Sequence, residues 1–213
     1  KKVDVIFTAS SSKNDHSMAV DIAKSHLPHD TPVIRLSFPM SRDKNLLEKA
    51  WSKNAESIIK HLREGKDVAF LTLGDCMTYS TFGYLGRTVK RLMPESSIVS
   101  VPGITSYQAA AARTNRPLVE GEEALLVLSG AKGGDRFRQL GQCAENIVFL
   151  KAYKNVPDIS RALTESGLLE NSVGVVACGL PQEKIVEDLR EFENFKPEYW
   201  TLILSKQKNG REE

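Results

Sequence analysis

The feature that most constrains the fold is a regular alternation of short apolar runs with stretches of helical spacing. The longest helical stretch extends from Asp43 to Glu64 and is followed by Gly65, a residue suited to the position just after a helix. Alternation of this kind is typical of parallel sheets with helical crossovers. The N-terminal part is therefore predicted to be an α/β domain with a mainly parallel sheet. Its predicted strands cover residues 3–9, 31–38, 67–73 and 96–102.

The alternation restarts after a solvated connection that contains Pro117, Gly121 and three acidic residues. The closing strands leave little room for crossover helices, so we expect them to pair antiparallel. The sequence thus predicts two α/β domains, 1–117 and 118–213, and a mixed sheet in the second. The predicted strands of the second domain cover residues 124–130, 146–152, 172–179 and 198–206.

Composition excludes several classes of protein. The net charge of +2 over 213 residues does not indicate a nucleic-acid partner. No apolar run approaches the roughly 20 residues that span a bilayer. Cys76, Cys143 and Cys178 are odd in number and far apart, which indicates free thiols in a reducing cytosol, and hence a cytoplasmic protein. The four histidines form no ligand pair with a carboxylate, so no metal site is expected.

Familiar catalytic motifs are absent. The sequence contains no GxGxxG, no GxxxxGK[ST], no GxSxG and no HExxH. Three adjacent serines, Ser10 to Ser12, have no neighbouring base. The run “GAKGGD” at 130–135 fits neither nucleotide-binding pattern, and we interpret it as a flexible turn. Nucleophilic hydrolysis has no motif in this chain.

What remains is a set of polar or small residues at predicted strand ends. In open α/β sheets, ligands bind beyond the carboxyl ends of the strands. Gly74 and Gly103 would let a ligand approach the backbone closely. Each residue alone could equally serve a turn, and Thr105 with Ser106 could cap a helix. Together they predict a pocket with polar edges at Asp75, Thr105, Ser106, Lys151, Ala152, Cys178 and Gly179.

Five segments carry a resemblance to a known family. “LTLGDCMTYST”, “VPGITSYQAAAA” and the closing “YWTLIL” resemble segments of the tetrapyrrole (corrin/porphyrin) methyltransferases. “TASSSKNDHSMAVDIA” and “LSFPMSRDK” resemble the C(20)-methyltransferase branch of cobalamin biosynthesis, which acts on precorrin-2 or cobalt-factor II. The resemblance covers nearly the whole chain. It implies a homodimer with S-adenosylmethionine in a cleft between two α/β domains.

The resemblance also implies contacts for individual residues. A carboxylate at position 75 would supply charge-assisted contacts to a cationic cofactor. No catalytic residue is implied, because an electron-rich meso carbon needs mostly proximity and orientation to attack a methyl group. The implied cofactor contacts are Leu73, Gly74, Asp75, Thr78, Thr105, Ser106, Ala152, Cys178, Trp200 and Thr201. The implied substrate contacts are Ser10, Ser11, Tyr79 and Arg113.

Because the macrocycle carries several carboxylates, basic residues are expected around it, although each could be an ordinary surface charge. The candidates are Arg87, Lys90, Arg91, Arg113, Arg116, Lys132, Arg136 and Arg138.

The sequence departs from the family pattern in two places. Cys76 stands where the family usually has proline. The family also has a strand and a GPGDP-type loop ahead of the segment with which this sequence begins. We therefore expect the strand at 3–9 to have an exposed backbone edge and the chain to need a preceding segment for full activity.

Three alternative functions stay open. The first is methylation of another tetrapyrrole position or of the diphthamide precursor on a protein. The second is a non-enzymatic tetrapyrrole-binding protein. The third is a plain nucleotide-binding α/β module.

Overall fold

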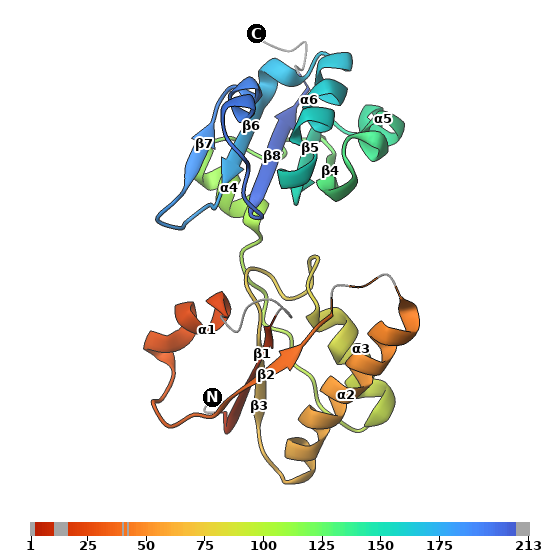
Figure 1. Cartoon of the computed structure of the whole chain (residues 1–213), viewed down its shortest axis with the longest axis vertical. Coiled ribbons are helices and arrows are strands. Elements are labelled where there is room, and N and C mark those ends of the chain that lie inside the picture. The colour runs from red at the N-terminus through yellow and green to blue at the C-terminus, as the bar shows by residue number, and fades with distance from the viewer. Residues whose placement is uncertain (1–2, 11–16, 40, 42, 208–213) are drawn as a thin grey trace. The chain divides into compact units, whose positions relative to one another are not determined.

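The computed structural model describes residues 3–10, 17–39, 41 and 43–207. Contacts divide the chain into two compact units, one up to Ile104 and one from Thr105 (Figure 1). The sequence predicted this division at 117/118, after the helix at 106–114 rather than before it. The helix groups with the second unit because Ala110 and Ala111 pack against strands of the second sheet.

The sheet of the first unit has three parallel strands in the order β2-β1-β3. They are β1 (Val5–Ser10), β2 (Val33–Ser37) and β3 (Val68–Leu71). The predicted parallel pairing is confirmed. The expectation that the first strand has an exposed edge is wrong, because β1 lies in the centre and is hydrogen-bonded to β2 on one side and β3 on the other.

Two long helices, α2 (Lys44–Arg63) and α3 (Phe82–Leu92), build the core of the first unit against this sheet. Asp43 caps α2 by accepting the N–H groups of Asn45 and Leu46 at 2.9 and 3.3 Å. Gly65 follows α2 with a φ of +75°, as its predicted role after the helix requires. The shorter α1 (Met18–Ala23) continues as a 3₁₀ turn, Lys24–His26.

The strand predicted over 96–102 is not formed. Its apolar residues are largely exposed, with Val99 81% and Val101 75% accessible. A strand requires a hydrogen-bonding neighbour, and no described strand pairs with this segment. The segment is instead attached to the loop after β3: the Cys76 Sγ donates to the Val101 carbonyl at 3.3 Å.

The sheet of the second unit is mixed, as predicted, with the order β4-β5-β8-β6-β7. β4 and β5 are parallel, whereas β8 runs antiparallel between β5 and β6. The short edge strand β7 was not predicted, because it lies in a polar segment and pairs over only three residues. The strands are β4 (Leu125–Ser129), β5 (Asn146–Leu150), β6 (Ser172–Val176), β7 (Lys184–Val186) and β8 (Thr201–Lys206).

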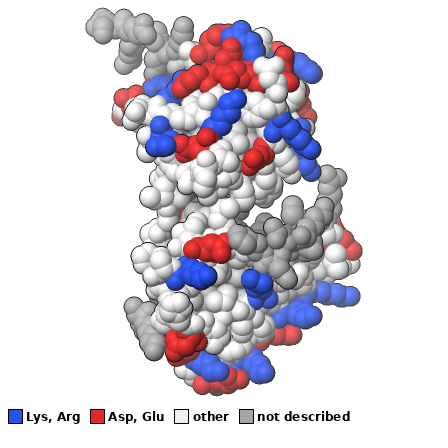
Figure 2. All heavy atoms as spheres, turned by 60° about the vertical axis from the view of Figure 1, so that its left-hand side comes forward, with Lys and Arg blue, Asp and Glu red and all other residues white. Residues whose placement is uncertain are grey.

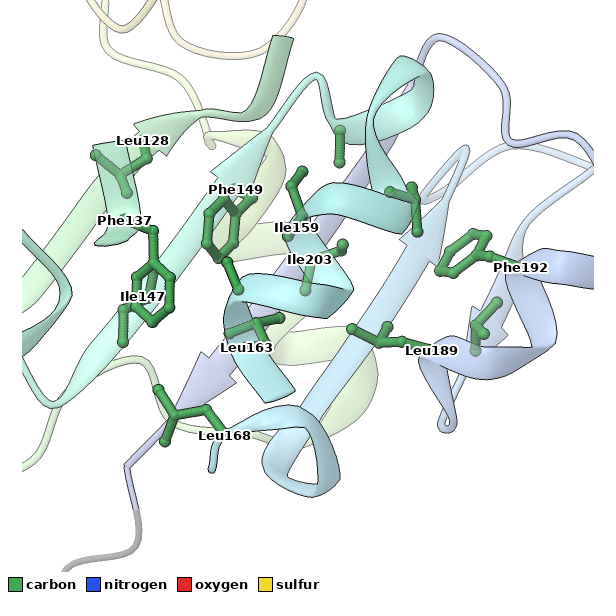
Figure 3. Packing of buried hydrophobic residues seen from close by; sticks show 14 of the residues in the cluster. Leu128, Phe137, Ile147, Phe149, Ile159, Leu163, Leu168, Leu189, Phe192 and Ile203 are labelled. Carbon is green, nitrogen blue, oxygen red and sulfur yellow. The ribbon is translucent and has the colours of Figure 1, made fainter. Parts of the chain in front are cut away.

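Helices cover both faces of this sheet. On one face, α6 (Val156–Glu165) buries Ile159 and Leu163 against Phe149 and Ile203 (Figure 3). On the other face lies α4 (Ser106–Thr114). The remaining helical elements are α5 (Asp135–Leu140) and the 3₁₀ turns Gly130–Lys132, Gly141–Cys143, Ala152–Lys154, Leu169–Asn171 and Leu189–Asn194.

The “GAKGGD” run is a closely packed turn rather than a flexible one. A Cβ on Gly134 would lie 2.6 Å from the Ala162 Cβ, so packing against α6 excludes a side chain there. Asp158 accepts the Gly134 N–H at 2.8 Å and pairs with Arg138 at 3.2 Å. Arg138 also pairs with Glu165 at 2.8 Å. The turn is therefore attached to α6 by packing and by charge.

We expect Asp158→Asn to lower the free energy of unfolding by about 1 kcal/mol at neutral pH, since it weakens this attachment. The Arg138 guanidinium, and then the Gly134 N–H, hold the pKa of Asp158 below its ordinary value. The contribution is thus present above the unfolded-state pKa and is lost as the pH falls through the folded-state pKa. Urea unfolding at neutral and acidic pH measures it. Asp135→Asn, 79% exposed and also beside Arg138, is the matched control and should change little.

Further structural facts bear on function. None of the helices in the described ranges is long and apolar enough to cross a bilayer. Within the same residues, no three His, Cys, Asp or Glu side chains are grouped so that they could hold a metal. Cys76, Cys143 and Cys178 are free thiols, as predicted.

Candidate functional site

The predicted site residues of the first unit gather at one edge of its sheet. β1 and β3 run parallel with Thr8 opposite Leu71, so both strands end at the same edge. Ser10 is the last residue of β1, and the loop after β3 carries the others. Ser11 lies outside the described residues. The predicted site residues within this loop are Leu73, Gly74, Asp75, Thr78 and Tyr79.

Asp75 holds this loop in place. Its Oδ1 accepts the Met77 N–H at 2.9 Å, and its Oδ2 accepts the Gly103 N–H at 3.1 Å. These two N–H groups, Gly103 first, lower the pKa of Asp75 below its ordinary value. The carboxylate therefore joins the loop at 74–78 to a backbone segment far along the chain.

Gly103 is required by the backbone of the protein itself. A Cβ at this position would lie 2.4 Å from the Gly74 carbonyl oxygen. Gly74 adopts a φ of +72°, which favours glycine. The interpretation that both glycines leave room for a ligand is wrong for Gly103, because the Gly74 carbonyl occupies that space.

The second unit also brings predicted residues to one edge of its sheet. Ala152 follows β5 and Cys178 follows β6, while Trp200 and Thr201 stand at the start of β8. Because β8 is antiparallel, its start lies beside the end of β6, with Thr201 opposite Val176. Ala152 is fully buried and Trp200 is 40% exposed. The Thr201 hydroxyl donates to the Glu198 carbonyl at 2.6 Å, which leaves its oxygen lone pairs as acceptors.

Two tyrosines that sequence reasoning missed lie at this edge. The ring centroids of Tyr153 and Tyr199 are 5.4 Å apart, and those of Tyr199 and Trp200 are 6.2 Å apart. Tyr199 is 47% exposed. The sequence held one signal that could have identified them: Tyr153 directly follows Ala152, and Tyr199 directly precedes Trp200. Partly exposed aromatic surface of this kind suits a planar ligand group.

Arg113, predicted to contact the substrate, forms an ion pair within the second unit. Its Nε lies 2.5 Å from Glu183 Oε1, and Glu183 also accepts the Gly179 N–H at 2.7 Å. These donors, Gly179 first, lower the pKa of Glu183. Burial and the negative charge of Glu183 raise the pKa of Cys178. Cys178 is therefore a neutral thiol and not a nucleophilic thiolate at neutral pH.

Thr105 and Ser106 begin α4. The Thr105 hydroxyl accepts the Gln108 N–H at 3.3 Å, and the Gln108 side chain accepts the Thr105 N–H at 3.0 Å. This reciprocal capping box confirms the alternative interpretation of Thr105 as a helix cap. Any ligand role of Thr105 would have to coexist with it.

Backbone strain concentrates at the same strand ends. Three non-glycine residues there adopt the left-handed conformation: Tyr79 with φ 51°, Lys151 with φ 58° and Ala177 with φ 48°. A fourth, Asn115, ends α4, where asparagine tolerates this conformation. Strain of this kind in buried or bulky residues is common at functional sites. It supports a binding role for both edges.

Several of the basic residues expected around the substrate have protein partners. Arg116 pairs with Glu187 at 2.6 Å, and the Lys90 Nζ donates to the carbonyls of Pro94 and Ser96. The Arg87 guanidinium lies 5.1 Å from the Tyr84 ring centroid. Figure 2 shows basic and acidic residues interspersed on one face of the molecule, without a large single-sign patch.

Comparison with known proteins shows clear similarity. The family model for tetrapyrrole (corrin/porphyrin) methylases matches residues 1–193. The cobalt-precorrin-2 C(20)-methyltransferase of Salmonella typhimurium is 30% identical over 207 residues, which cover 96% of this chain and 86% of that protein. The probable cobalt-precorrin-2 C(20)-methyltransferase of Methanocaldococcus jannaschii is 39% identical over 137 residues, covering 64% and 57%.

Solved structures show the same fold at lower identity. A cobalt-precorrin-4 methyltransferase superposes with a TM-score of 0.72 at 20% identity, covering 96% of this chain and 84% of that one. A uroporphyrin-III C-methyltransferase from Thermus thermophilus, in complex with S-adenosylhomocysteine, superposes with a TM-score of 0.65 at 18% identity, covering 96% and 86%.

Proposed function

The chain belongs to the tetrapyrrole (corrin/porphyrin) methylase family, and from this premise we propose that it transfers a methyl group from S-adenosylmethionine to C(20) of precorrin-2 or its cobalt complex, a step of cobalamin biosynthesis. The substrate assignment rests on the relatives that carry this activity in their names. The structural observation that carries the proposal is the gathering of the predicted residues, with strained backbone, at one edge of each sheet.

The residues at these edges fit the chemistry of the cofactor. Leu73 is 48% exposed and lies next to Gly74 in the loop after β3 that Asp75 holds in place. The backbone of this loop can bind the polar part of a ligand. Tyr199 and Trp200 offer half-exposed aromatic surface to an adenine ring. We assign the cofactor contacts to Leu73, Gly74, Asp75, Thr78, Thr105, Ser106, Cys178 and Trp200. Ala152 and Thr201, also predicted, are buried at 0% and 1% exposure, so we assign them to the support of the edge beneath the ligand.

The protein's contribution to the reaction is binding and orientation. S-adenosylmethionine, when bound, supplies a methyl group activated by its sulfonium. The chain's residues would hold the electron-rich meso carbon of the ring at this methyl group, which converts an encounter into an oriented displacement. The bond from the methyl group to sulfur breaks, S-adenosylhomocysteine is released, and a proton leaves the ring. No side chain needs to act as a nucleophile, in agreement with the neutral Cys178 thiol. Cobalt, where present, enters as part of the substrate.

Incubation with S-adenosylmethionine and either ring form tests the proposal. We expect mass spectrometry to show one added methyl group on the ring, and isotopic labelling of the product to place it at C(20). Calorimetry should show binding of S-adenosylhomocysteine that a chelator leaves unchanged. Methylation at another ring position would contradict the assignment to C(20) and support the first alternative function. Ring binding without methyl transfer would support the second alternative, a non-enzymatic tetrapyrrole-binding protein. Absence of cofactor binding would overturn the proposal.

We also propose a cytosolic homodimer that needs no disulfide. The three free thiols are consistent with a reducing compartment. Light scattering at micromolar concentration with reductant should give twice the monomer mass of 23.6 kDa. A monomer under these conditions would contradict this prediction.

A further inference from the structure

A small cavity in the first unit lies where β1 and β3 end, beside the loop that Asp75 holds. Its volume is about 280 Å³, below the range usual for whole ligands of drug size. It can therefore take one side arm of a macrocycle but not the ring. Seven of its lining residues carry hydroxyl groups: Thr8, Ser17, Thr72, Thr78, Tyr79, Ser80 and Thr81.

Two of these hydroxyls are buried and share one hydrogen bond. Thr8 is 1% exposed and Ser17 is 8% exposed, and their Oγ atoms are 2.6 Å apart. In such a pair one hydrogen is donated to the partner, so one hydroxyl hydrogen is left for another acceptor. A threonine on the inward side of an otherwise apolar strand is costly unless it is satisfied. The pair thus presents a donor next to the cavity.

The rest of the lining shows which ligand group would fit. None of the described residues that line the cavity carries a charge. Leu71, Met18 and Ala9 supply apolar surface for methylene groups. The eleven-residue helix α3 begins directly after Ser80 and Thr81, and the Thr81 side chain makes no capping bond. The first turn of a helix favours negative charge, which adds to the attraction of the hydroxyl donors.

We infer that this hydroxyl-lined cavity seats one carboxylate-bearing side arm of the tetrapyrrole, with the arm's methylenes on the apolar surface and its carboxylate at the Thr8–Ser17 pair and the neighbouring hydroxyls. The inference rests on the proposed function and names a substrate contact within it. Tyr79, implied as a substrate contact by the family resemblance, lines the cavity. Leu73 and Thr78, assigned to the cofactor above, line it as well, so the side arm would lie directly beside the cofactor. Thr8, Ser17 and Thr72 were not singled out by the sequence.

The test removes the buried hydroxyls with isosteric changes in the full chain. Thr8→Val combined with Ser17→Ala should weaken binding of the cobalt–precorrin-2 complex roughly tenfold, as expected for the loss of the one hydrogen bond that the pair can donate to a charged carboxylate. Binding is followed by the absorbance of the ring. S-adenosylhomocysteine affinity, measured by calorimetry, should change less than about twofold, and KM should rise while kcat is kept.

A matched control makes the same chemical changes elsewhere in the first unit. Thr88→Val with Ser96→Ala also removes a threonine and a serine hydroxyl that are buried, at 7% and 6% exposure, but do not line the cavity. Ring affinity should be unchanged in this variant. If the Thr8/Ser17 variant loses its fold, Thr72→Val is the second test. The Thr72 hydroxyl also belongs to the lining, and its removal should weaken ring binding roughly threefold.

Different outcomes separate the two hypotheses. Equal ring affinity in the wild-type protein, the double variant and Thr72→Val would overturn the inference and leave the proposed function intact. An equal loss of ring and S-adenosylhomocysteine affinity would assign the cavity to the cofactor instead and also overturn it. A wild-type protein that binds S-adenosylhomocysteine but no ring would overturn the proposed substrate, and the inference with it.

Discussion

Replacing Asp75 by alanine will weaken S-adenosylhomocysteine binding roughly tenfold or more and lower methyl transfer at least as much. The carboxylate accepts the N–H groups of Met77 and Gly103, and hydrogen bonds to a charged group are the stronger ones. Without them the loop after β3 loses its connection to the backbone at 103. The affinity of Asp75→Asn should lie between those of the wild type and Asp75→Ala, because the single amide oxygen of asparagine can replace only one of the two accepting carboxylate oxygens. Isothermal calorimetry gives the affinity, and single-turnover kinetics give the rate.

The neighbouring Cys76 supplies the control. Its thiol makes one weak contact, to the Val101 carbonyl, so Cys76→Pro should change the affinity less than about threefold. If Cys76→Ala abolished activity while Asp75→Ala spared it, the assignment of this loop would be wrong. The pH dependence has a definite sign. Because the folded-state pKa of Asp75 is lowered, its contribution is present above the unfolded-state pKa and is lost as the pH falls through the folded-state pKa.

Gly103→Ala is expected to lower the free energy of unfolding of the first unit by about 1–3 kcal/mol, the usual cost of overpacking. Its Cβ would lie 2.4 Å from the Gly74 carbonyl oxygen. The Gly74 backbone cannot move aside as a flexible side chain can. Residue 103 would therefore have to shift, and its N–H would lose the hydrogen bond to Asp75. We expect cofactor affinity to fall together with stability, and urea unfolding combined with calorimetry measures both.

Gly86→Ala is the matched change in α3 of the same unit. Its Cβ would meet Phe82 at 3.7 Å, an ordinary contact. Alanine is the better helix former, so stability should rise by about 0.5–1 kcal/mol. Cofactor affinity should be unchanged. A Gly103→Ala protein as stable and as tightly binding as the wild type would show that the loop and residue 103 are not in contact in solution.

Much of the fold could be predicted from the sequence, because local patterns carry it. Apolar runs and helical spacing located β1, β2, β3 and α2, and Gly65 marked the end of α2; the predicted first helical residue, Asp43, proved to be its cap. The shortage of crossover segments near the C-terminus predicted the antiparallel pairing of β8. Family motifs suggested Asp75 and Trp200 as cofactor contacts, and this assignment stays a prediction. Each of these signals lies within a few neighbouring residues.

The tertiary structure decided what depends on partners distant in the chain. β1 became the central strand because β2 and β3 pair on opposite sides of it, whereas 96–102 formed no strand for want of a described neighbour. Arg113 is paired with Glu183, and Asp75 with the Gly103 N–H. These outcomes depend on hydrogen-bond geometry at the scale of tenths of an ångström, between residues whose proximity no local pattern encodes. For the same reason, only the three-dimensional arrangement could show that Thr8 and Ser17 share a hydrogen bond at the edge of a cavity.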